Sequence, residues 1–319
     1  MKKKLKPDNF TPVLLSGILM LFMPVSELYC ETMSVEKSRD KKFEIETGIG
    51  LGNLGYYVDT AAGSLLRWRD SANFQQNIKL KYSFSDKLYG SMIFENYILS
   101  GGEMTDDDLN NLYGTNMGVY STTRNMKGSG YRLDITGGCN FFTIGNIDFI
   151  GTAGFFIRKY EIKPKGILQV GFDGNEPRCW VYYDDQNVVH TEIIWKGLQV
   201  GTQILNNITD SAKFIFDINL TFPLAHESKQ YYWGYKGPDY DWKLKQDTIL
   251  KNRGIDLRIE NRFRLSDFLW WGIYGYYSRM KSTDQDEIDW DGSSYKKVGT
   301  ANSSVLSMAG AGVSLYFLF

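Results

Sequence analysis

The last segment of the chain alternates between two chemically different faces. Residues 305–319 read VLSMAGAGVSLYFLF, with a run of apolar side chains on one parity. The other parity carries Gly310, Gly312, Ser314 and Tyr316. Because successive side chains of a strand point to opposite faces, this pattern predicts a strand with one face against an apolar medium. Soluble proteins seldom expose such a strand at a sheet edge, since it promotes aggregation.

Nine other segments alternate in the same way. With the last one, the ten segments are approximately Phe43–Leu51, Phe74–Phe84, Leu88–Ile98, Tyr131–Phe141, Ile147–Glu161, Val189–Ile204, Ala212–Phe222, Ile249–Phe263, Phe268–Arg279 and Val305–Phe319. Each is long enough for a tilted strand to cross a membrane, which takes about 9–11 residues. The sequence therefore predicts an all-β fold: a ten-stranded antiparallel transmembrane β-barrel. The terminal strand resembles the closing strand of bacterial outer-membrane barrels.

The connections between these segments alternate in length. The short ones are Ser85–Lys87, Thr143–Asn146, Asn206–Ser211 and Arg264–Asp267, and the long ones are Gly52–Asn73, Leu99–Gly130, Ile162–Asn187, Pro223–Thr248 and Met280–Ser303. Short periplasmic turns opposite long external loops are typical of barrels in the bacterial outer membrane. We therefore expect the protein to lie in that membrane.

The inward faces of the predicted strands carry charges of both signs. They include Lys79, Lys81, Glu95, Arg132, Asp134, Lys213, Asp217, Asp256, Arg258, Glu260 and Arg262. Such charges can pair across a lumen, and ten strands enclose little space. We expect a lumen filled by side chains, which argues against a general porin or a small-solute channel.

The start of the chain has the features of an export signal. Lysines between Lys2 and Lys6 precede an apolar run, Pro12–Val25, that is short for a membrane span. We predict a signal peptide at residues 1–30, a short periplasmic leader at 31–42 and the barrel at 43–319. The alternative is an N-terminal membrane anchor. The three cysteines, of which Cys30 follows the apolar run, do not predict a disulfide framework.

The sequence also bounds the cofactor and partner classes. It contains no phosphate loop, nucleotide fingerprint, zinc-ligand spacing or nucleophile elbow. We expect no cofactor, no metal and no nucleic-acid partner, and a monomer in contact with outer-membrane lipid. The acidic stretch Asp284–Asp291 favours cationic ligands at the rim, or is a plain soluble loop. The aromatic run Tyr231–Trp242 fits ligand contact or the aromatic girdle of a barrel.

Three stretches resemble the omptin family of outer-membrane endopeptidases, which are ten-stranded barrels with a cleft at their outer rim. Gly101–Leu109, GGEMTDDDL, is similar to the family's GG-x-M-x-D-x-D after the third strand. Ala153–Gly166, AGFFIRKYEIKPKG, resembles a second signature in spacing and aromatic pattern, and Leu66–Arg69 resembles a Trp-containing approach to the second strand. The match puts Asp106 and Asp108 at the positions of the catalytic aspartate pair.

The acidic stretch also has a meaning of its own. Carboxylates at i and i+2 of an extended strand point the same way, so Asp106 and Asp108 can converge on one water or one cation. Two close carboxylates raise one another's proton affinity, which suits general acid–base chemistry. The alternative is a solvated acidic loop or a weak calcium site.

The chain departs from the omptin pattern at the catalytic histidine. The family carries an Asp-x-His dyad on its fourth external loop, whereas residues 222–233 read FPLAHESKQYYW. By counting, the family's histidine falls near Tyr231 or Tyr232, and the histidine present in this stretch is His226, followed by Glu227. Either His226 acts as the base with Glu227 orienting it, or the catalytic activity is lost.

The resemblance also implies a lipopolysaccharide contact. The family's Tyr, Glu and Arg at these positions are replaced here by Phe155, Ile157 and Lys159. Arg158 and Lys159 retain the charge to pair with a lipid phosphate, or they are ordinary rim charges.

Taken together, these features favour an omptin-like endopeptidase acting on cationic peptides or on basic segments of host or surface proteins. Asp106, Asp108, His226 and Glu227 are its candidate catalytic residues. The alternative is a catalytically inactive omptin-like barrel that serves as a surface binding protein or adhesin.

Overall fold

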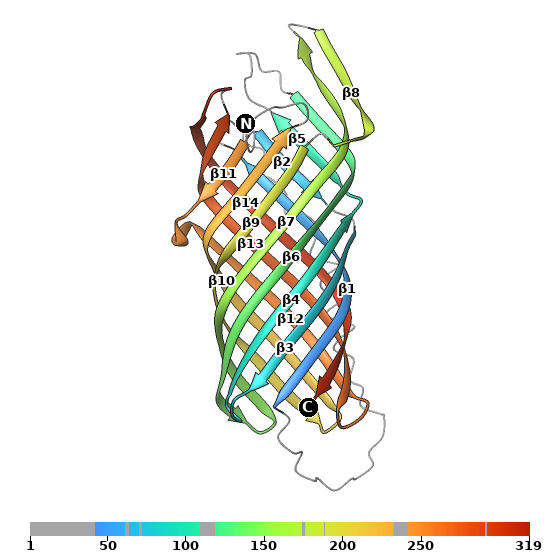
Figure 1. The fold of residues 1–319 in the computed structure, drawn as a ribbon, viewed down its shortest axis with the longest axis vertical. Helices are drawn as coiled ribbons and strands as arrows, with labels where there is room; N and C mark the ends of the chain where they lie inside the picture. The colour runs from blue at the N-terminus through green and yellow to red at the C-terminus, as the bar shows by residue number, and fades with distance from the viewer. Residues whose placement is uncertain are drawn as a thin grey trace, which may run out of the picture. The chain divides into compact units, whose positions relative to one another are not determined.

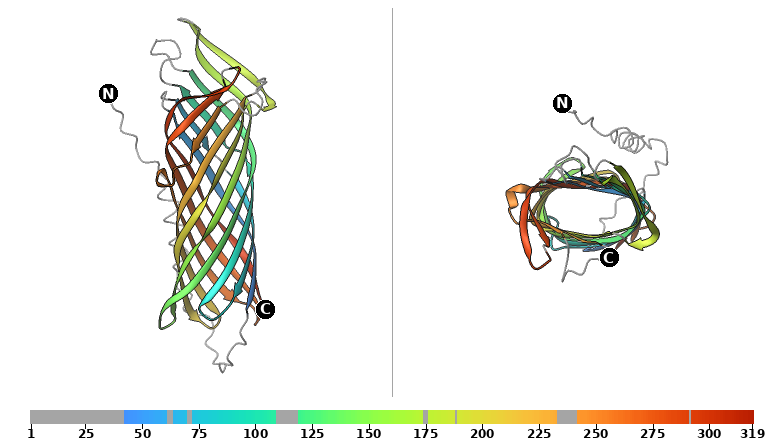
Figure 2. Two further views of the ribbon diagram at one scale, coloured as in Figure 1. Left: turned by 60° about the vertical axis from the view of Figure 1, so that its left-hand side comes forward. Right: turned by 90° about the horizontal axis from the view of Figure 1, so that it is seen from above.

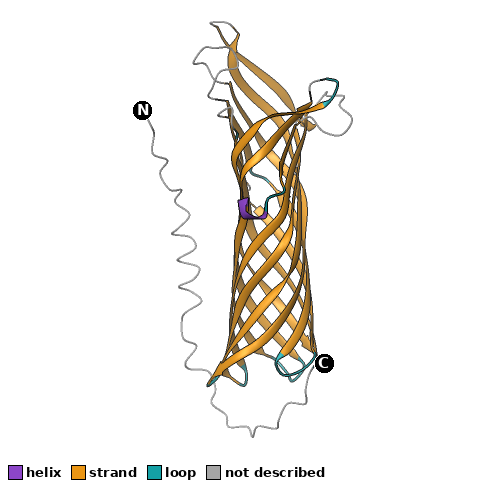
Figure 3. Ribbon diagram, turned by 90° about the vertical axis from the view of Figure 1, so that its left-hand side faces the viewer, coloured by secondary structure: helices purple, strands orange, loops and turns teal. Residues whose placement is uncertain are grey.

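The computed structural model describes residues 42–60, 64–69, 72–108, 119–173, 176–187, 189–232, 242–290 and 292–319. The signal peptide and nearly all of the leader predicted above, with Cys30, lie outside these residues. The described strands are β1 (Phe43–Asp59), β2 (Ser64–Arg69), β3 (Ala72–Ser83), β4 (Leu88–Ser100), β5 (Glu103–Asp108), β6 (Val119–Ile144), β7 (Ile147–Asp173), β8 (Glu176–Asn187), β9 (Val189–Thr209), β10 (Ala212–Tyr232), β11 (Trp242–Gln246), β12 (Asn252–Arg264), β13 (Leu269–Trp290) and β14 (Tyr295–Leu318). A 3-10 helix, η1 (Ile249–Lys251), lies between β11 and β12 (Figure 3).

Ten strands close a ring in which every neighbouring pair is antiparallel (Figures 1 and 2). The order is β1, β3, β4, β6, β7, β9, β10, β12, β13 and β14, and β14 returns to pair with β1. Each member of the ring overlaps one of the ten predicted segments, so the predicted fold class is confirmed. Closure leaves the ring without an unpaired edge, which removes the aggregation hazard of its apolar strands.

Apolar side chains point outward around the part of the barrel next to the short turns. Leu51, Phe155 and Ile135 are 67%, 62% and 54% exposed. The same belt contains Ile49, Ile78, Met92, Phe94, Ile98, Ile157, Val200, Leu220, Phe222, Leu224, Ile273, Val313 and Leu315. We call it the lipid-facing band, because a closed barrel with this surface is stable against hydrocarbon. The chain is thus an outer-membrane β-barrel, and the membrane-spanning part of β10 ends at Leu224.

Beyond the lipid-facing band the inward side chains of the wall are mainly apolar, whereas within the band they are mainly polar or charged. Along β1 the buried inward side chains change from Glu46 to Leu54, Tyr56 and Val58. One apolar cluster fills this part, which we call the outer barrel; its members include Leu66, Trp68, Tyr97, Leu99, Met104, Met126, Tyr160, Ile162, Ile193, Trp195, Leu244, Met280, Leu306 and Met308. A wall surrounded by water requires an apolar interior, so the outer barrel is built like a soluble β-barrel.

The long loops predicted from the sequence are largely strand. β1 continues to Asp59, β7 continues to Asp173, and β13 and β14 extend to Trp290 and Tyr295. The loop prediction was wrong because these segments alternate with apolar residues inside and polar residues outside, the reverse of the lipid-facing pattern. The short turns were predicted correctly: β3 and β4, for example, are joined by residues 84–87.

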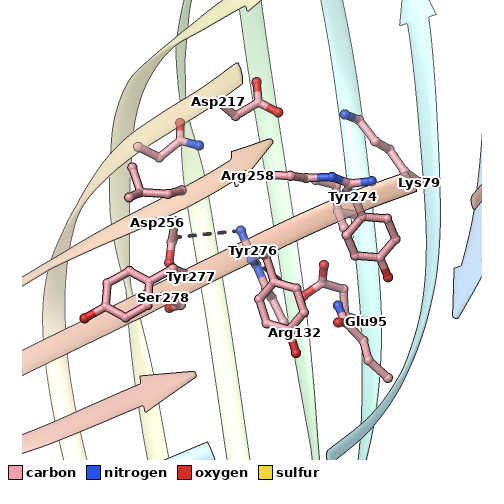
Figure 4. Close-up of a pocket in the computed structure, with 14 residues that line it drawn as sticks. Lys79, Glu95, Arg132, Asp217, Asp256, Arg258, Tyr274, Tyr276, Tyr277 and Ser278 are labelled. Carbon is pink, nitrogen blue, oxygen red and sulfur yellow. Dashed lines mark ion pairs between the residues drawn. The ribbon is translucent and has the colours of Figure 1, made fainter. Parts of the chain in front are cut away.

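Ion pairs fill the lumen at the level of the membrane, as predicted. Arg158 is 1% exposed and binds Asp256 with both Nη atoms, one of them 3.0 Å from Oδ1. Arg132 Nη2 lies 3.8 Å from Asp256 Oδ2, and its Nη1 lies 3.5 Å from Glu95 (Figure 4). A cavity of about 70 Å³ remains among these groups, room for a few water molecules.

Candidate functional site

A bulge in β10 decides the direction of the candidate base. Up to Pro223 the odd-numbered residues of β10 face inward, but pairing with β9 shifts between Pro223 and Ala225. Beyond that shift the even-numbered residues are buried: His226, Ser228 and Gln230 are each no more than 1% exposed. The extra residue of a bulge redirects every side chain that follows it. His226 therefore points into the outer barrel.

His226 is enclosed by the outer barrel's interior. Its ring stacks on Trp195 with centroids 3.8 Å apart and an interplanar angle of 29°. Its Nδ1 contacts the side-chain amide of Gln285. With the amide nitrogen of Gln285 as the donor, Nδ1 accepts and Nε2 carries the ring proton. Nε2 makes no hydrogen bond to any described residue. In that tautomer Nε2 has no lone pair that could accept a proton, and in either tautomer the ring is fully buried.

Burial also sets the charge state of this histidine. His226 is fully buried, two residues beyond the end of the lipid-facing band on β10, and among the described side chains no carboxylate shifts its pKa. Removing it from water disfavours the imidazolium ion and lowers the pKa of His226 to about 3. A general base should instead have a pKa near the working pH. The side chain is neutral and buried at physiological pH.

Glu227 does not orient His226, because it lies on the other face of β10. Its carboxylate faces the outside and is 3.1 Å from Lys229 Nζ and 2.6 Å from Lys243 Nζ. These lysines lower the pKa of Glu227 through hydrogen bonds, against the opposing effect of partial burial. The predicted His226–Glu227 dyad is therefore not formed.

The acidic motif forms part of the outer wall. Asp106 and Asp108 are in β5, where Asp106 pairs with Leu66 of β2 and with Ser121 of β6. Their side chains lie outside the described part of the structure. The residues before them have structural roles. Gly101 and Gly102 adopt φ of 82° and 89° where β4 ends and β5 begins, a conformation that glycine favours. Met104 is 3% exposed in the apolar cluster.

The chain's other histidine, His190, faces outward on β9. Its Nε2 is 2.7 Å from Glu161 Oε1, and its ring lies 5.2 Å from that of Tyr231. It belongs to a surface ion-pair network outside the apolar cluster. The chain has two histidines: His226 is buried in the outer barrel, and His190 is on its outer face.

The predicted lipid-binding pair is divided between the two faces of β7. Arg158 is buried in the lumen on Asp256, so the expectation that it contacts lipid is wrong. Lys159 points outward, 3.7 Å from Glu192, next to the lipid-facing Ile157. Side chains of adjacent strand residues point to opposite faces, so Arg158 and Lys159 cannot bind the same phosphate.

Two residues that the sequence analysis missed determine the site. Trp195 and Gln285 come from β9 and β13 and hold the His226 ring from two sides. Gln285 faces inward directly after Asp284, which has a φ of 50°, uncommon for a residue other than glycine. Nothing in the local sequence marks either residue, because their approach depends on the pairing of distant strands.

Comparison with known proteins supports the fold. No protein-family model and no curated protein matches the chain. Among solved structures, outer membrane protease OmpT from Escherichia coli is similar with a TM-score of 0.70 and 13% identity, over 91% of this chain and 99% of that one. The translocator domain of autotransporter NalP from Neisseria meningitidis reaches a TM-score of 0.34 and 9% identity, over 89% and 90% of the two chains. The first likeness shows an omptin-like barrel fold.

Proposed function

We propose that this protein is a non-catalytic binding protein of the cell surface, built on an omptin-like barrel. The observation that carries the proposal is the burial of His226 against Trp195 and Gln285. With His226 buried, Asp106 and Asp108 lack the imidazole base that the omptin-like arrangement pairs with them for peptide hydrolysis. The fold is retained while the aspartate–histidine chemistry is absent, and fold alone does not carry function.

A hairpin at the outer end offers a surface for binding. β13 and β14 run on to Trp290 and Tyr295, whose rings lie 4.9 Å apart. Exposed Asp289 lies on the same hairpin, as does exposed Asp286, which is 2.6 Å from Lys297 Nζ. Aromatic side chains bordered by charges are typical of protein-binding surfaces. The partner class is a protein segment with basic residues, which the acidic groups of the hairpin attract.

A single peptide substrate tests binding and cleavage together. The full-length protein, folded in detergent with lipopolysaccharide, is mixed with a fluorescent peptide containing two adjacent arginines. We expect saturable binding by anisotropy and an intact peptide by mass spectrometry. Trp290→Ala combined with Tyr295→Ala should weaken binding about tenfold, whereas Asp106→Asn and His226→Ala should leave the peptide as intact as the parent does.

The opposite outcome is equally clear. Cleavage by the parent that disappears in Asp106→Asn would reinstate the peptidase function. Cleavage that also disappears in a folded His226→Ala variant would mean that β10 rearranges to expose the imidazole. An intact peptide that does not bind would reject the hairpin as its site.

A further inference from the structure

Three metal-ligating side chains converge on the outer face of the barrel wall. Glu161 of β7 lies directly opposite Glu192 of β9 in the strand register. His190 is two residues from Glu192, so it shares that face. His190 Nε2 is 2.7 Å from Glu161 Oε1 and 3.9 Å from Glu192 Oε1, and one ligand atom of each residue lies within 4.8 Å of the other two. A nitrogen and two carboxylates thus face one point.

The strand register places two carboxylates directly opposite each other. Like charges directly opposite each other in an antiparallel pair are destabilising. Here Glu161 and Glu192 occupy such a pair, and Nε2 of His190 is within 4 Å of a carboxylate oxygen of each. An acidic patch alone would not include an imidazole nitrogen at this distance. The arrangement matches the mixed ligand set that Zn²⁺ accepts.

We propose that Glu161, His190 and Glu192 form a binding site for a zinc-type divalent cation. With bonds of about 2.0–2.2 Å, the ligand atoms of a tetrahedral zinc site lie about 3.4 Å apart. The distances from His190 Nε2 to the two carboxylates, 2.7 Å and 3.9 Å, lie on either side of that value. The three residues leave one position free for water or for a ligand from outside.

Two lysines occupy the site in the absence of metal. Lys163 Nζ is 2.7 Å from Glu161 Oε1, and Lys159 Nζ is 3.7 Å from Glu192 Oε2. Both are long, partly exposed side chains that can swing into solvent. A cation must displace Lys163 in particular, because the cation and Lys163 Nζ would both bind Glu161 Oε1. The lysine therefore sets the affinity, and its removal should strengthen metal binding.

The site is accessible from outside the cell. Glu161 lies four residues beyond the lipid-facing Ile157 on β7, about 13 Å along the strand. All three side chains are 22–29% exposed. The cation can thus enter from the medium just above the membrane surface. The site is on the opposite face of the wall from His226, so the inference does not depend on the proposed function.

Metal titration of the full-length protein without a histidine tag tests the site. We expect calorimetry to show one saturable Zn²⁺ per chain, and Co²⁺ to give the strong visible absorption of a four-coordinate ion. His190→Gln should weaken Zn²⁺ binding at least tenfold, and Lys163→Met should strengthen it severalfold. Excess Ca²⁺ should not compete, since it prefers six to eight oxygen ligands.

A matched control excludes a general effect of surface charge. Asp286 is an exposed carboxylate held 2.6 Å from Lys297, with the same pairing but no imidazole beside it. Asp286→Asn should bind Zn²⁺ like the parent. Heat-modifiable migration on gels confirms that each variant is folded. Absence of saturable Zn²⁺ binding in the parent, or unchanged binding in folded His190→Gln, would overturn the proposal.

Discussion

His226 and Glu227 are sequence neighbours with opposite surroundings. One is stacked in an apolar interior and the other is held by two lysines in contact with water. Period-two alternation makes this separation unavoidable, and the bulge after Pro223 decides which of the two faces inward. A catalytic assignment from spacing alone could not distinguish these cases, because a bulge is not visible in a pattern of residue types.

Acid should destabilise the outer barrel through His226. Its pKa is lowered to about 3 in the folded protein, against an ordinary value of 6.5. Between these values the unfolded chain binds more protons, so stability is complete above pH 6.5 and falls as the pH drops toward 3. The contribution of this residue is about 1.4 kcal/mol per pH unit. Urea unfolding at several pH values should show a shallower pH dependence for His226→Phe than for the parent; identical slopes would refute the assignment.

The lumen pair Arg158–Asp256 should be costly to break. Asp256→Asn leaves a buried guanidinium without its bidentate partner, which we expect to lower the free energy of unfolding by about 3 kcal/mol. Urea unfolding in detergent measures the change. The double variant Arg158→Met with Asp256→Leu should recover most of the loss, because no unpaired charge remains. A double variant as unstable as the single one would contradict this explanation.

At the scale of the strands, the omptin-like acidic motif is explained in part by architecture. Gly101 and Gly102 adopt the positive φ angles that end β4 and begin β5, and Met104 packs in the apolar cluster. These positions are those that match the family best, yet they serve the fold. The resemblance in GG-x-M is therefore evidence for the barrel rather than for catalysis.

Glycines in β14 allow the closing strand to pack against a tyrosine. A Cβ at Gly312 would collide with the carbonyl oxygen of Ile49 and with the hydroxyl of Tyr274. Gly312→Ala should therefore reduce the folded, heat-modifiable fraction on gels. Gly275→Ala is the matched control, because its nearest neighbour would be Gly310 O at 3.8 Å. Equal loss in both variants would point to strand flexibility rather than to close packing.

For the whole molecule, different kinds of side chain fill the lumen and the interior of the outer barrel. Ion pairs fill the lumen in the membrane, and apolar side chains fill the outer barrel. The cavity of about 70 Å³ among the ion pairs is small beside the side chains that line it. We therefore expect no conductance steps in planar lipid bilayers. Regular steps that persist in the purified monomer would require a different interior.

The sequence was sufficient for the barrel and insufficient for the site. Alternation facing lipid is strong, so all ten strands and the inward charges such as Arg132 and Asp217 could be predicted. The length of the strands in the outer barrel was underestimated because their alternation has the opposite polarity and resembles loop sequence. Contacts such as Gln285 with His226 depend on strand register over 59 residues, which composition and spacing do not encode.

The central claim is that His226 is a sealed, neutral side chain rather than a catalytic base. Imidazole NMR of the folded protein tests it directly, because the chain contains only two histidines. We predict that the resonance absent from a His226→Phe sample stays at its neutral, Nε2-protonated position from pH 8 down to pH 5. A resonance assigned to His226 that titrates near its ordinary pKa of 6.5 would contradict the account.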